Sequence, residues 1–182
     1  LILLHACIVK NPKHEVSIGK IEVIDPELSS ILDTNAIIEI IAEGHEWTEG
    51  PVWVESEKKL LYSDIPQNRI FEWTEERGAV LYLKKSGYTG STARGGELGS
   101  NGLLLDKNAK LILCQHGDRR IAMMDAEVSG PESRFITMAD RYNDKRFNSP
   151  NDACLRSNGD IFFTDPPYGL EGYVDDPAKE IP

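Results

Sequence analysis

Short apolar stretches separated by polar turns recur along most of the chain. Each apolar stretch is three to six residues long and ends at a turn such as Lys107-Asn108 or Asn158-Gly159. Stretches of this length, bounded by turn residues, are typical of β-strands joined in antiparallel hairpins. The predicted first strands are 52–54, 103–105 and 153–155, the third strands are 69–73 and 120–125, and the fourth strands are 80–83 and 134–138. The pattern therefore predicts units of four antiparallel strands.

The same unit occurs three times, in nearly constant register. The equivalent positions are Gly50, Asn101 and Asn151, and likewise Leu60, Leu111 and Ile161, at spacings of 51 and 50 residues. Four antiparallel strands every ~50 residues are typical of propeller blades. A β-sandwich is the alternative, but it gives no reason for the repeat. We therefore predict an all-β propeller, of which residues 37–182 form about three blades, with the blades that close the ring lying beyond Pro182.

Residues 1–36 differ from the repeats and are predicted to be a lead-in to the propeller. Asp25 and Pro26 favour the start of a short helix that runs to residue 32, and residues 36–44 favour a strand. The apolar residues 1–9 with Cys7 are similar to the end of a bacterial lipoprotein signal. They predict a secreted, periplasmic or lipid-anchored protein. The alternative is an apolar terminus without a targeting role, in a cytoplasmic protein.

The composition narrows the range of partners. The chain has 20 basic and 30 acidic residues, a net charge of −10 and a pI near 4.9, so a nucleic acid backbone would be repelled and a hard cation attracted. No stretch approaches the ~18 apolar residues of a membrane span. Three widely spaced cysteines form neither a disulfide framework nor a zinc site. Cys114 and Cys154 lie in apolar stretches, and we expect both to be buried.

Polar residues lie at one end of the predicted hairpins. In an antiparallel unit, the first strand begins at the edge where the second strand ends, and we call this edge the mouth. The residues at the mouth are Glu49, Asn101 and Asn151 before first strands, and Asp64, Gln115, His116 and Asp165 after second strands. Carboxylate and amide oxygens are the ligands of calcium, so the mouth favours a Ca²⁺ site, with Zn²⁺, Mg²⁺ or Mn²⁺ as alternatives. Each residue alone is also compatible with a turn.

Two of the aspartates are better explained by structure than by chemistry. Asp64 and Asp165 occupy equivalent positions, which favours a repeated structural corner. At the corner between them, His116 is expected to replace the aspartate and to contact substrate, with a solvated loop histidine as the alternative. The glycine-rich loop 86–100 leads to the mouth, and Arg94 within it is a candidate substrate contact or a solvated charge.

Five segments together resemble the senescence marker protein (regucalcin)/gluconolactonase family, and most closely its bacterial gluconolactonases. These segments are GHEWTEGPVW from residue 44, LLYSDIPQNRIFEWT from 60, SGYTG and RGGELGSNGL within 86–103, CQHGDRRI from 114, and RFNSPNDACLRSNGDIFFTDPPYGL from 146. The resemblance covers residues 37–182. It implies a six-bladed propeller that binds a divalent cation, often calcium, and hydrolyses sugar lactones.

The resemblance also implies roles for individual residues. Glu49 and Asn151 match two metal ligands of the family, and Asn101 matches an asparagine that borders the metal and contacts substrate. The third ligand, an aspartate that also serves as the catalytic acid or base, would lie beyond Pro182. Regucalcin-like members have an arginine where this chain has Gly99, so sugar recognition is expected to use His116 and the loop that contains Arg94.

The predicted activity is hydrolysis of an aldonolactone, with a divalent cation that polarises the lactone carbonyl for attack by water. No Gly-x-Ser-x-Gly motif supports a nucleophilic serine. An esterase or phosphotriesterase of the same fold is one alternative, and a calcium-binding propeller without catalysis is another. The 182 residues alone are expected to be inactive, because they lack ring closure and the catalytic aspartate.

Overall fold

The computed structural model describes residues 18–182, which belong to two compact units that divide between Glu43 and Gly44. In the N-terminal unit, the predicted short helix is present as the 3₁₀ helix η1, Pro26–Ser30. The Asp25 carboxylate caps it by accepting a hydrogen bond from the backbone N–H of Glu27. The predicted signal-like residues 1–9 lie outside the described residues. None of the helices in residues 18–182 is long and apolar enough to cross a membrane.

The strand expected over residues 36–44 is not formed, and this prediction was wrong. Glu39 has an isolated bridge, and the backbone N–H of Ile18 donates to the carbonyl of Ile38. Ile37 and Ile40 remain 59% and 48% exposed. A strand needs a partner that pairs along its whole length. No strand in residues 18–182 pairs with this segment in that way.

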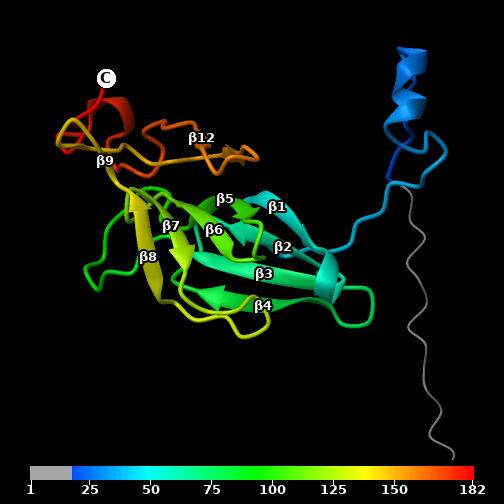
Figure 1. Ribbon diagram of the computed structural model, residues 1–182, viewed down its shortest axis with the longest axis horizontal. Coiled ribbons are helices and arrows are strands. Elements are labelled where there is room, and N and C mark those ends of the chain that lie inside the picture. Colours follow the sequence, from blue (N-terminus) through cyan, green and yellow to red (C-terminus); the bar gives the residue numbers. More distant parts are fainter. Residues whose placement is uncertain (1–17) are drawn as a thin grey trace, which may run out of the picture. The chain divides into compact units, whose positions relative to one another are not determined.

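Residues 44–182 form antiparallel β-sheets whose strands follow the order of the chain (Figure 1). The first sheet contains β1 (Thr48–Val54), β2 (Lys59–Asp64), β3 (Arg69–Thr74) and β4 (Gly78–Lys84), and the 3₁₀ helix η2 (Glu55–Glu57) joins β1 to β2. The second sheet contains β5 (Ser100–Leu105), β6 (Leu111–Gln115), β7 (Arg120–Met124) and β8 (Phe135–Ala139). Both four-stranded units predicted from the repeats are therefore confirmed.

The third repeat is smaller than predicted from the pattern. It contains the hairpin β11 (Ala153–Leu155) and β12 (Ile161–Phe163), followed by the 3₁₀ helix η3 (Tyr173–Asp175). A separate two-stranded ribbon, β9 (Arg141–Tyr142) and β10 (Lys145–Arg146), lies between the second sheet and this hairpin in the sequence. The described part of the chain thus has an all-β fold with two complete repeats and half of a third.

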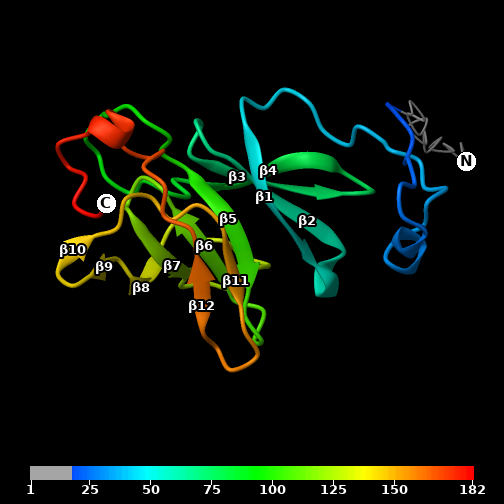
Figure 2. The same cartoon turned by 90° about the horizontal axis from the view of Figure 1, so that it is seen from above.

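The strand β6 explains how the sheets pack. All five of its residues are buried, because alternate side chains enter different cores. Leu111 and Leu113 pack into a core with residues of the first sheet, while Ile112 and Cys114 pack into a core with β11 and β12. Figure 2 shows β5 between β1 and β11, which agrees with the contacts between these strands. The strand β6 of the second sheet is therefore covered on both faces, while the outer strand β8 is largely exposed.

The two cysteines in strands have different environments. Cys114 is fully buried as predicted, and burial raises the pKa of its thiol to about 12, so it is unreactive. Cys154 is exposed, and the prediction that it is buried was wrong. It pairs with Phe162, which is 54% exposed. The reason is that no described sheet covers this face of the β11–β12 hairpin.

The predicted structural corners are confirmed. The carboxylate of Asp64 at the end of β2 accepts hydrogen bonds from the backbone N–H groups of Glu46 and Trp47. The carboxylate of Asp165, just after β12, likewise accepts from Asn148 and Ser149, at 2.8 Å in both cases. Each aspartate thus ties the end of a second strand to the loop that leads into the first strand of the same unit.

Replacing Asp64 with alanine should lower the free energy of unfolding by about 3 kcal/mol, because two backbone donors then lose a charged acceptor in a buried site. Urea unfolding measures the change. The control is Asp125→Ala, which removes an exposed carboxylate that is paired with Arg134. It should change stability by less than about 1 kcal/mol. Equal effects of the two substitutions would contradict the structural role of Asp64.

Candidate functional site

The predicted mouth is formed by first strands that lie unusually close together. The first strand of each complete repeat has an irregularity at the same position, between Glu49 and Val52 in β1 and between Ser100 and Leu103 in β5. At Gly50, φ is +58°, and a Cβ atom would lie 2.1 Å from the carbonyl oxygen of Asn101. Only glycine fits this position without strain.

The next pair of strands is packed in a similar way. A Cβ atom on Gly102 would lie 2.9 Å from the carbonyl oxygen of Asn151, and the backbone N–H of Gly102 donates a 2.7 Å hydrogen bond to that oxygen. The backbone at Gly50, Asn101 and Asn151 is therefore contiguous across three repeats. The structure brings together the backbone positions that the repeat register predicted for the mouth.

The side chain of Glu49 lies on the exposed side of this arrangement. Its Oε1 accepts a 3.1 Å hydrogen bond from the indole N–H of Trp47. Within residues 18–182, neither Asn101 nor Asn151 forms a hydrogen bond with this carboxylate. Glu49 therefore keeps a charged, accessible carboxylate beside the first of the close strands.

Asn101 is buried, and the neighbouring second strand β2 holds its backbone through a hydrogen bond. The Ser63 hydroxyl donates to the carbonyl oxygen of Asn101 at 2.9 Å and also contacts the Ser100 hydroxyl at 2.8 Å. The Asn101 side-chain amide forms no hydrogen bond with the described residues. The amide is not among the buried polar atoms that lack a partner, so it reaches solvent and is suited to contact a ligand or an ion at the mouth.

His116 and Asn151 are in direct contact. The Nε2 atom of His116 lies 3.3 Å from the amide nitrogen of Asn151, and the imidazole is fully buried. The Nδ1 atom of His116 lies 3.2 Å from a carboxylate oxygen of Glu97. This second contact has the distance of an ion pair but not the angle of a hydrogen bond, so Nδ1 has no hydrogen-bond partner.

The Glu97 carboxylate favours a proton on the nearer imidazole nitrogen, Nδ1, because it attracts positive charge. Nε2 then accepts a hydrogen bond from the Asn151 amide N–H. This orientation leaves the amide oxygen of Asn151 free to bind a cation. The sequence singled out Glu97, with Arg94, only as a loop charge that could reach a ligand or remain solvated. It did not predict the contact with His116, since a carboxylate in a glycine-rich loop has no pattern that points to a histidine 19 residues later.

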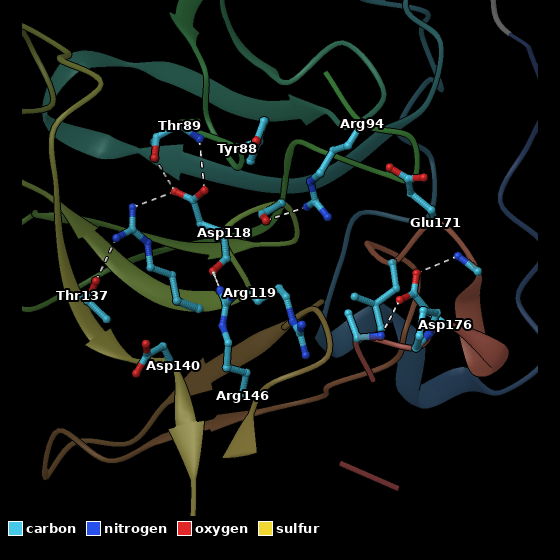
Figure 3. A pocket seen from close by; sticks show the side chains of 16 residues that line it. Tyr88, Thr89, Arg94, Asp118, Arg119, Thr137, Asp140, Arg146, Glu171 and Asp176 are labelled. Carbon is cyan, nitrogen blue, oxygen red and sulfur yellow. Dashed lines mark hydrogen bonds and ion pairs between the residues drawn. The ribbon is translucent and has the colours of Figure 1, made fainter. Parts of the chain in front are cut away.

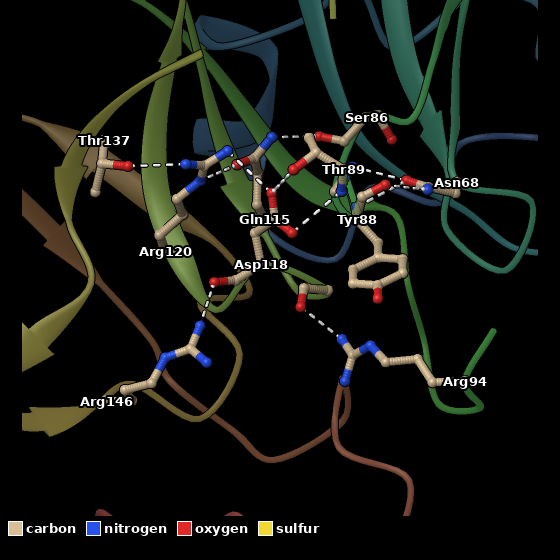
Figure 4. Close-up of polar contacts among 12 residues, drawn as sticks. Asn68, Ser86, Tyr88, Thr89, Arg94, Gln115, Asp118, Arg120, Thr137 and Arg146 are labelled. Atoms are coloured by element: carbon tan, nitrogen blue, oxygen red, sulfur yellow. Dashed lines mark hydrogen bonds and ion pairs between the residues drawn. The ribbon is translucent and has the colours of Figure 1, made fainter. Parts of the chain in front are cut away.

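The alignment of His116 with the aspartate corners was wrong. Strand pairing places Asp64 opposite Arg69 and Gln115 opposite Arg120, so Gln115 occupies the aspartate position. The amide of Gln115 donates to the carbonyl of Ser86 and accepts from Arg120 (Figure 4). An amide can do both, whereas a carboxylate can only accept.

His116 is instead equivalent to Ile65, the first residue of the turn after the second strand. The backbone N–H of Asn68 donates to the carbonyl of Ile65, and that of Arg119 donates to the carbonyl of His116. Both donor residues have a left-handed backbone, with φ of 53° and 60°. The position of His116 is therefore set by a turn that the two repeats share.

Arg94 lines a cavity beside the turn after β6 (Figure 3). This cavity has a volume of about 820 Å³. Arg94 donates from Nη2 to the carbonyl of Gly117 at 2.6 Å and stacks on the ring of Tyr88. Glu49, Asn101, His116 and Asn151 are not among the residues that line the cavity. The structure therefore brings the side chains of His116 and Asn151 together, places Glu49 and Asn101 at the starts of neighbouring first strands, and places Arg94 in the wall of a cavity that these four residues do not line.

The donors at the mouth fit a hard cation. They are the carboxylate of Glu49 and the amide oxygens of Asn101 and Asn151, the oxygen types that calcium prefers. Among the described residues 18–182, no group of three or more His, Cys, Asp or Glu side chains is arranged to hold a metal. A site built from one carboxylate and amides is of a different type, and the chain supplies only part of the six to eight ligands that calcium takes.

Comparison with known proteins gives consistent matches. The family model described as the SMP-30/gluconolactonase/LRE-like region matches residues 47–177. The gluconolactonase of Zymomonas mobilis subsp. mobilis is 40% identical over 174 residues, which are 94% of this chain and 48% of that protein. The chain thus spans about half the length of this relative.

Two solved structures are also similar to this chain. One is a structural-genomics target assigned as a gluconolactonase. The match has a TM-score of 0.65 and 33% identity, and it covers 81% of this chain and 46% of the target's chain. The other, from Xanthomonas campestris, is described as a gluconolactonase important in glucose secondary metabolic pathways. The match has a TM-score of 0.57 and 32% identity, and it covers 74% of this chain and 38% of the Xanthomonas chain.

Replacing Gly50 with alanine should lower the free energy of unfolding by about 3 kcal/mol, through left-handed strain and a clash with Asn101. The matched control is Gly78→Ala, since Gly78 has φ of +67° but open space around its Cβ position. The control should lower the free energy of unfolding by only about 1 kcal/mol, because it adds the left-handed strain without the clash. Urea unfolding of both variants separates the cost of the left-handed strain from the cost of the clash. Equal losses of stability in the two variants would show that the close strand contact is unimportant.

Proposed function

Because this chain belongs to the SMP-30/gluconolactonase/LRE-like family, we propose that it is the first part of a six-bladed β-propeller that hydrolyses a sugar lactone. In this proposal, further blades complete the ring in the full-length protein. The 182 residues alone are inactive in this proposal, because the ring is open and the catalytic aspartate is absent from them.

The observation that carries the proposal is the contact between His116 and Asn151 next to the close strands. It leaves the amide oxygen of Asn151 free, beside the buried Asn101. The exposed carboxylate of Glu49 lies at the equivalent edge of the first repeat. Three oxygen donors at the starts of neighbouring first strands favour a divalent cation, and Ca²⁺ suits their chemistry best.

Each residue has a distinct part in the proposed reaction. Glu49 and Asn151 hold the cation, and Asn101 contacts the lactone beside it. A bound cation supplies Lewis-acid chemistry, which stabilises negative charge on the carbonyl oxygen. Water adds to the carbonyl carbon while a carboxylate accepts its proton, and the protonated carboxyl group then returns that proton to the ring oxygen as the ring C–O bond breaks, which gives the free hydroxy acid. The aspartate expected after Pro182 supplies that carboxylate.

A gluconolactone assay of the full-length protein, followed by acid release at constant pH, tests the activity. Turnover should stop on addition of a chelator and return with Ca²⁺. Glu49→Gln and Asn151→Ala should each lower kcat/KM by about 100-fold, since the cation and the charge it stabilises are lost. Glu76→Gln and Asn108→Ala, which change exposed residues outside the mouth, should have no effect.

The outcomes also separate the alternatives. Turnover that is insensitive to chelator would exclude the metal mechanism. Faster hydrolysis of an aryl ester or a phosphotriester than of gluconolactone would favour an esterase or phosphotriesterase. Calcium binding without turnover of any of these substrates would favour a binding module.

His116 should control the affinity for Ca²⁺ by fixing the Asn151 amide. His116→Ala should raise the calorimetric Kd for Ca²⁺ by about 10-fold to 100-fold, the usual effect of removing a group that orients a ligand. The control is His45→Ala, which removes an imidazole that contacts the Tyr62 hydroxyl at 2.9 Å. It should lower stability but leave the Kd unchanged. An equal loss of affinity in both variants would indicate a general effect of destabilisation.

A further inference from the structure

The cavity that contains Arg94 is a second candidate site, and its lining is rich in arginine. It lies between the loop around Tyr88, the turn after β6 and the segment 170–178, and four arginines contribute to its wall. They are Arg120 and the three arginines labelled in Figure 3, Arg94, Arg119 and Arg146. Four carboxylates, those of Asp118, Asp140, Glu171 and Asp176, also line the cavity. Whether the arginines are compensated therefore depends on what each carboxylate contacts.

Arg119 is the most deeply buried of these residues. It is 5% exposed, and its Nε donates to the carbonyl of Phe147 at 2.6 Å. Its Nη2 atom is buried without a hydrogen-bond partner. Burial, followed by the nearby charge of Arg146, lowers the pKa of Arg119. A buried guanidinium with an unused donor and a like charge beside it is an unfavourable arrangement unless an anion binds there.

Two further arginines are held only by neutral acceptors. Arg146 donates from Nη2 to the carbonyl of Asp118 at 2.8 Å, and Arg94 donates to the carbonyl of Gly117. The Nε atom of Arg94 is also buried without a partner. Among the described residues, no carboxylate lies within ion-pair distance of Arg94, Arg119 or Arg146. None of these three arginines therefore has a direct ion-pair partner, although Glu180 and Asp165 attract Arg119 at longer range.

Arg120 lines the same cavity, but its charge is paired with a carboxylate. Its Nη2 lies 2.9 Å from a carboxylate oxygen of Asp118, and that carboxylate also accepts hydrogen bonds from the backbone N–H and the hydroxyl of Thr89 (Figure 4). Both carboxylate oxygens of Asp118 are therefore engaged by Arg120 and Thr89. This leaves the other three arginines without Asp118 as a counter-ion.

The three remaining carboxylates of the wall are engaged with other groups. That of Asp140 lies 3.9 Å from the Nε atom of Arg141, which does not line the cavity. Glu171 accepts a hydrogen bond from the backbone N–H of Gly95. Asp176 accepts from the backbone N–H groups of Gly172 and Ala178, and these bonds lower the pKa of its carboxyl group. Glu171 and Asp176 thus organise the loops of the cavity, and none of the three carboxylates pairs with the arginines that line it.

We propose that this cavity binds an oxyanion, the phosphate or carboxylate group of a small polar molecule, through Arg94, Arg119 and Arg146. Guanidinium groups bind both kinds of anion with paired hydrogen bonds. The volume of about 820 Å³ exceeds that of one phosphate ion, so a ligand of sugar size fits. The proposal does not rest on lactone hydrolysis, because the residues of the mouth do not line this cavity.

Isothermal titration of the full-length protein with inorganic phosphate, and separately with gluconate, tests the proposal at low ionic strength. We expect saturable binding of at least one anion, weakened by added salt. Arg146→Gln should raise its Kd at least about tenfold, the effect of losing a hydrogen bond to a charged group. The matched control is Arg134→Gln, which removes an exposed arginine outside the cavity that is paired with Asp125 and Glu132.

Arg119→Lys provides a second variant, because it keeps the charge but loses the forked donor geometry, and it should also weaken binding. Circular dichroism checks that each variant is folded. Binding of phosphate but not gluconate would assign the site to phosphates, and the reverse would assign it to carboxylates. No saturable binding of either anion, or equal Kd values for Arg146→Gln and Arg134→Gln, would overturn the proposal.

Discussion

Close contact between the first strands of neighbouring repeats is the constraint on which the candidate site depends. At Gly50 and Gly102, the backbone of the next repeat occupies the space that a side chain would need. This contact fixes where the first strand of the next repeat begins, and so it fixes the position of Asn101 and Asn151. Polar side chains at these positions are then held at one edge by the fold itself, before any ligand binds.

Most of the fold could be predicted because two independent patterns agreed. Apolar stretches located the strands, and the repeat register assigned each strand its place in a sheet, so β1 to β8 lie where they were expected. The errors occurred in segments that have the sequence pattern of a buried strand but no neighbouring sheet to cover them. The segment 36–44 has an apolar composition that suits a strand, and Cys154 lies in a true strand. Burial of either segment requires a neighbouring sheet, which local sequence cannot supply.

The candidate site was predictable only at the level of the backbone. Repeat spacing placed Asn101 and Asn151 at equivalent positions and Glu49 one position before their equivalent, Gly50. It could not show that Glu49 contacts Trp47 or that Asn151 contacts His116. It also assigned His116 to the wrong corner, since an alignment that tolerates a shift of one residue cannot separate Gln115 from its neighbour. Only strand pairing resolves this difference, because Gln115 lies opposite Arg120.

The turn between β6 and β7 links the two candidate sites. It contains His116, whose imidazole contacts Asn151 at the mouth, and Arg119, whose guanidinium lines the arginine cavity. The backbone N–H of Arg119 donates to the carbonyl of His116 at 3.1 Å, so the same hydrogen bond orders both side chains. Arg119 also adopts a left-handed backbone with φ of 60°, which directs its side chain away from the course of the preceding strand. One short turn thereby presents an imidazole to an oxygen-rich edge and a cation to a separate cavity, although the two residues are only three positions apart in the sequence.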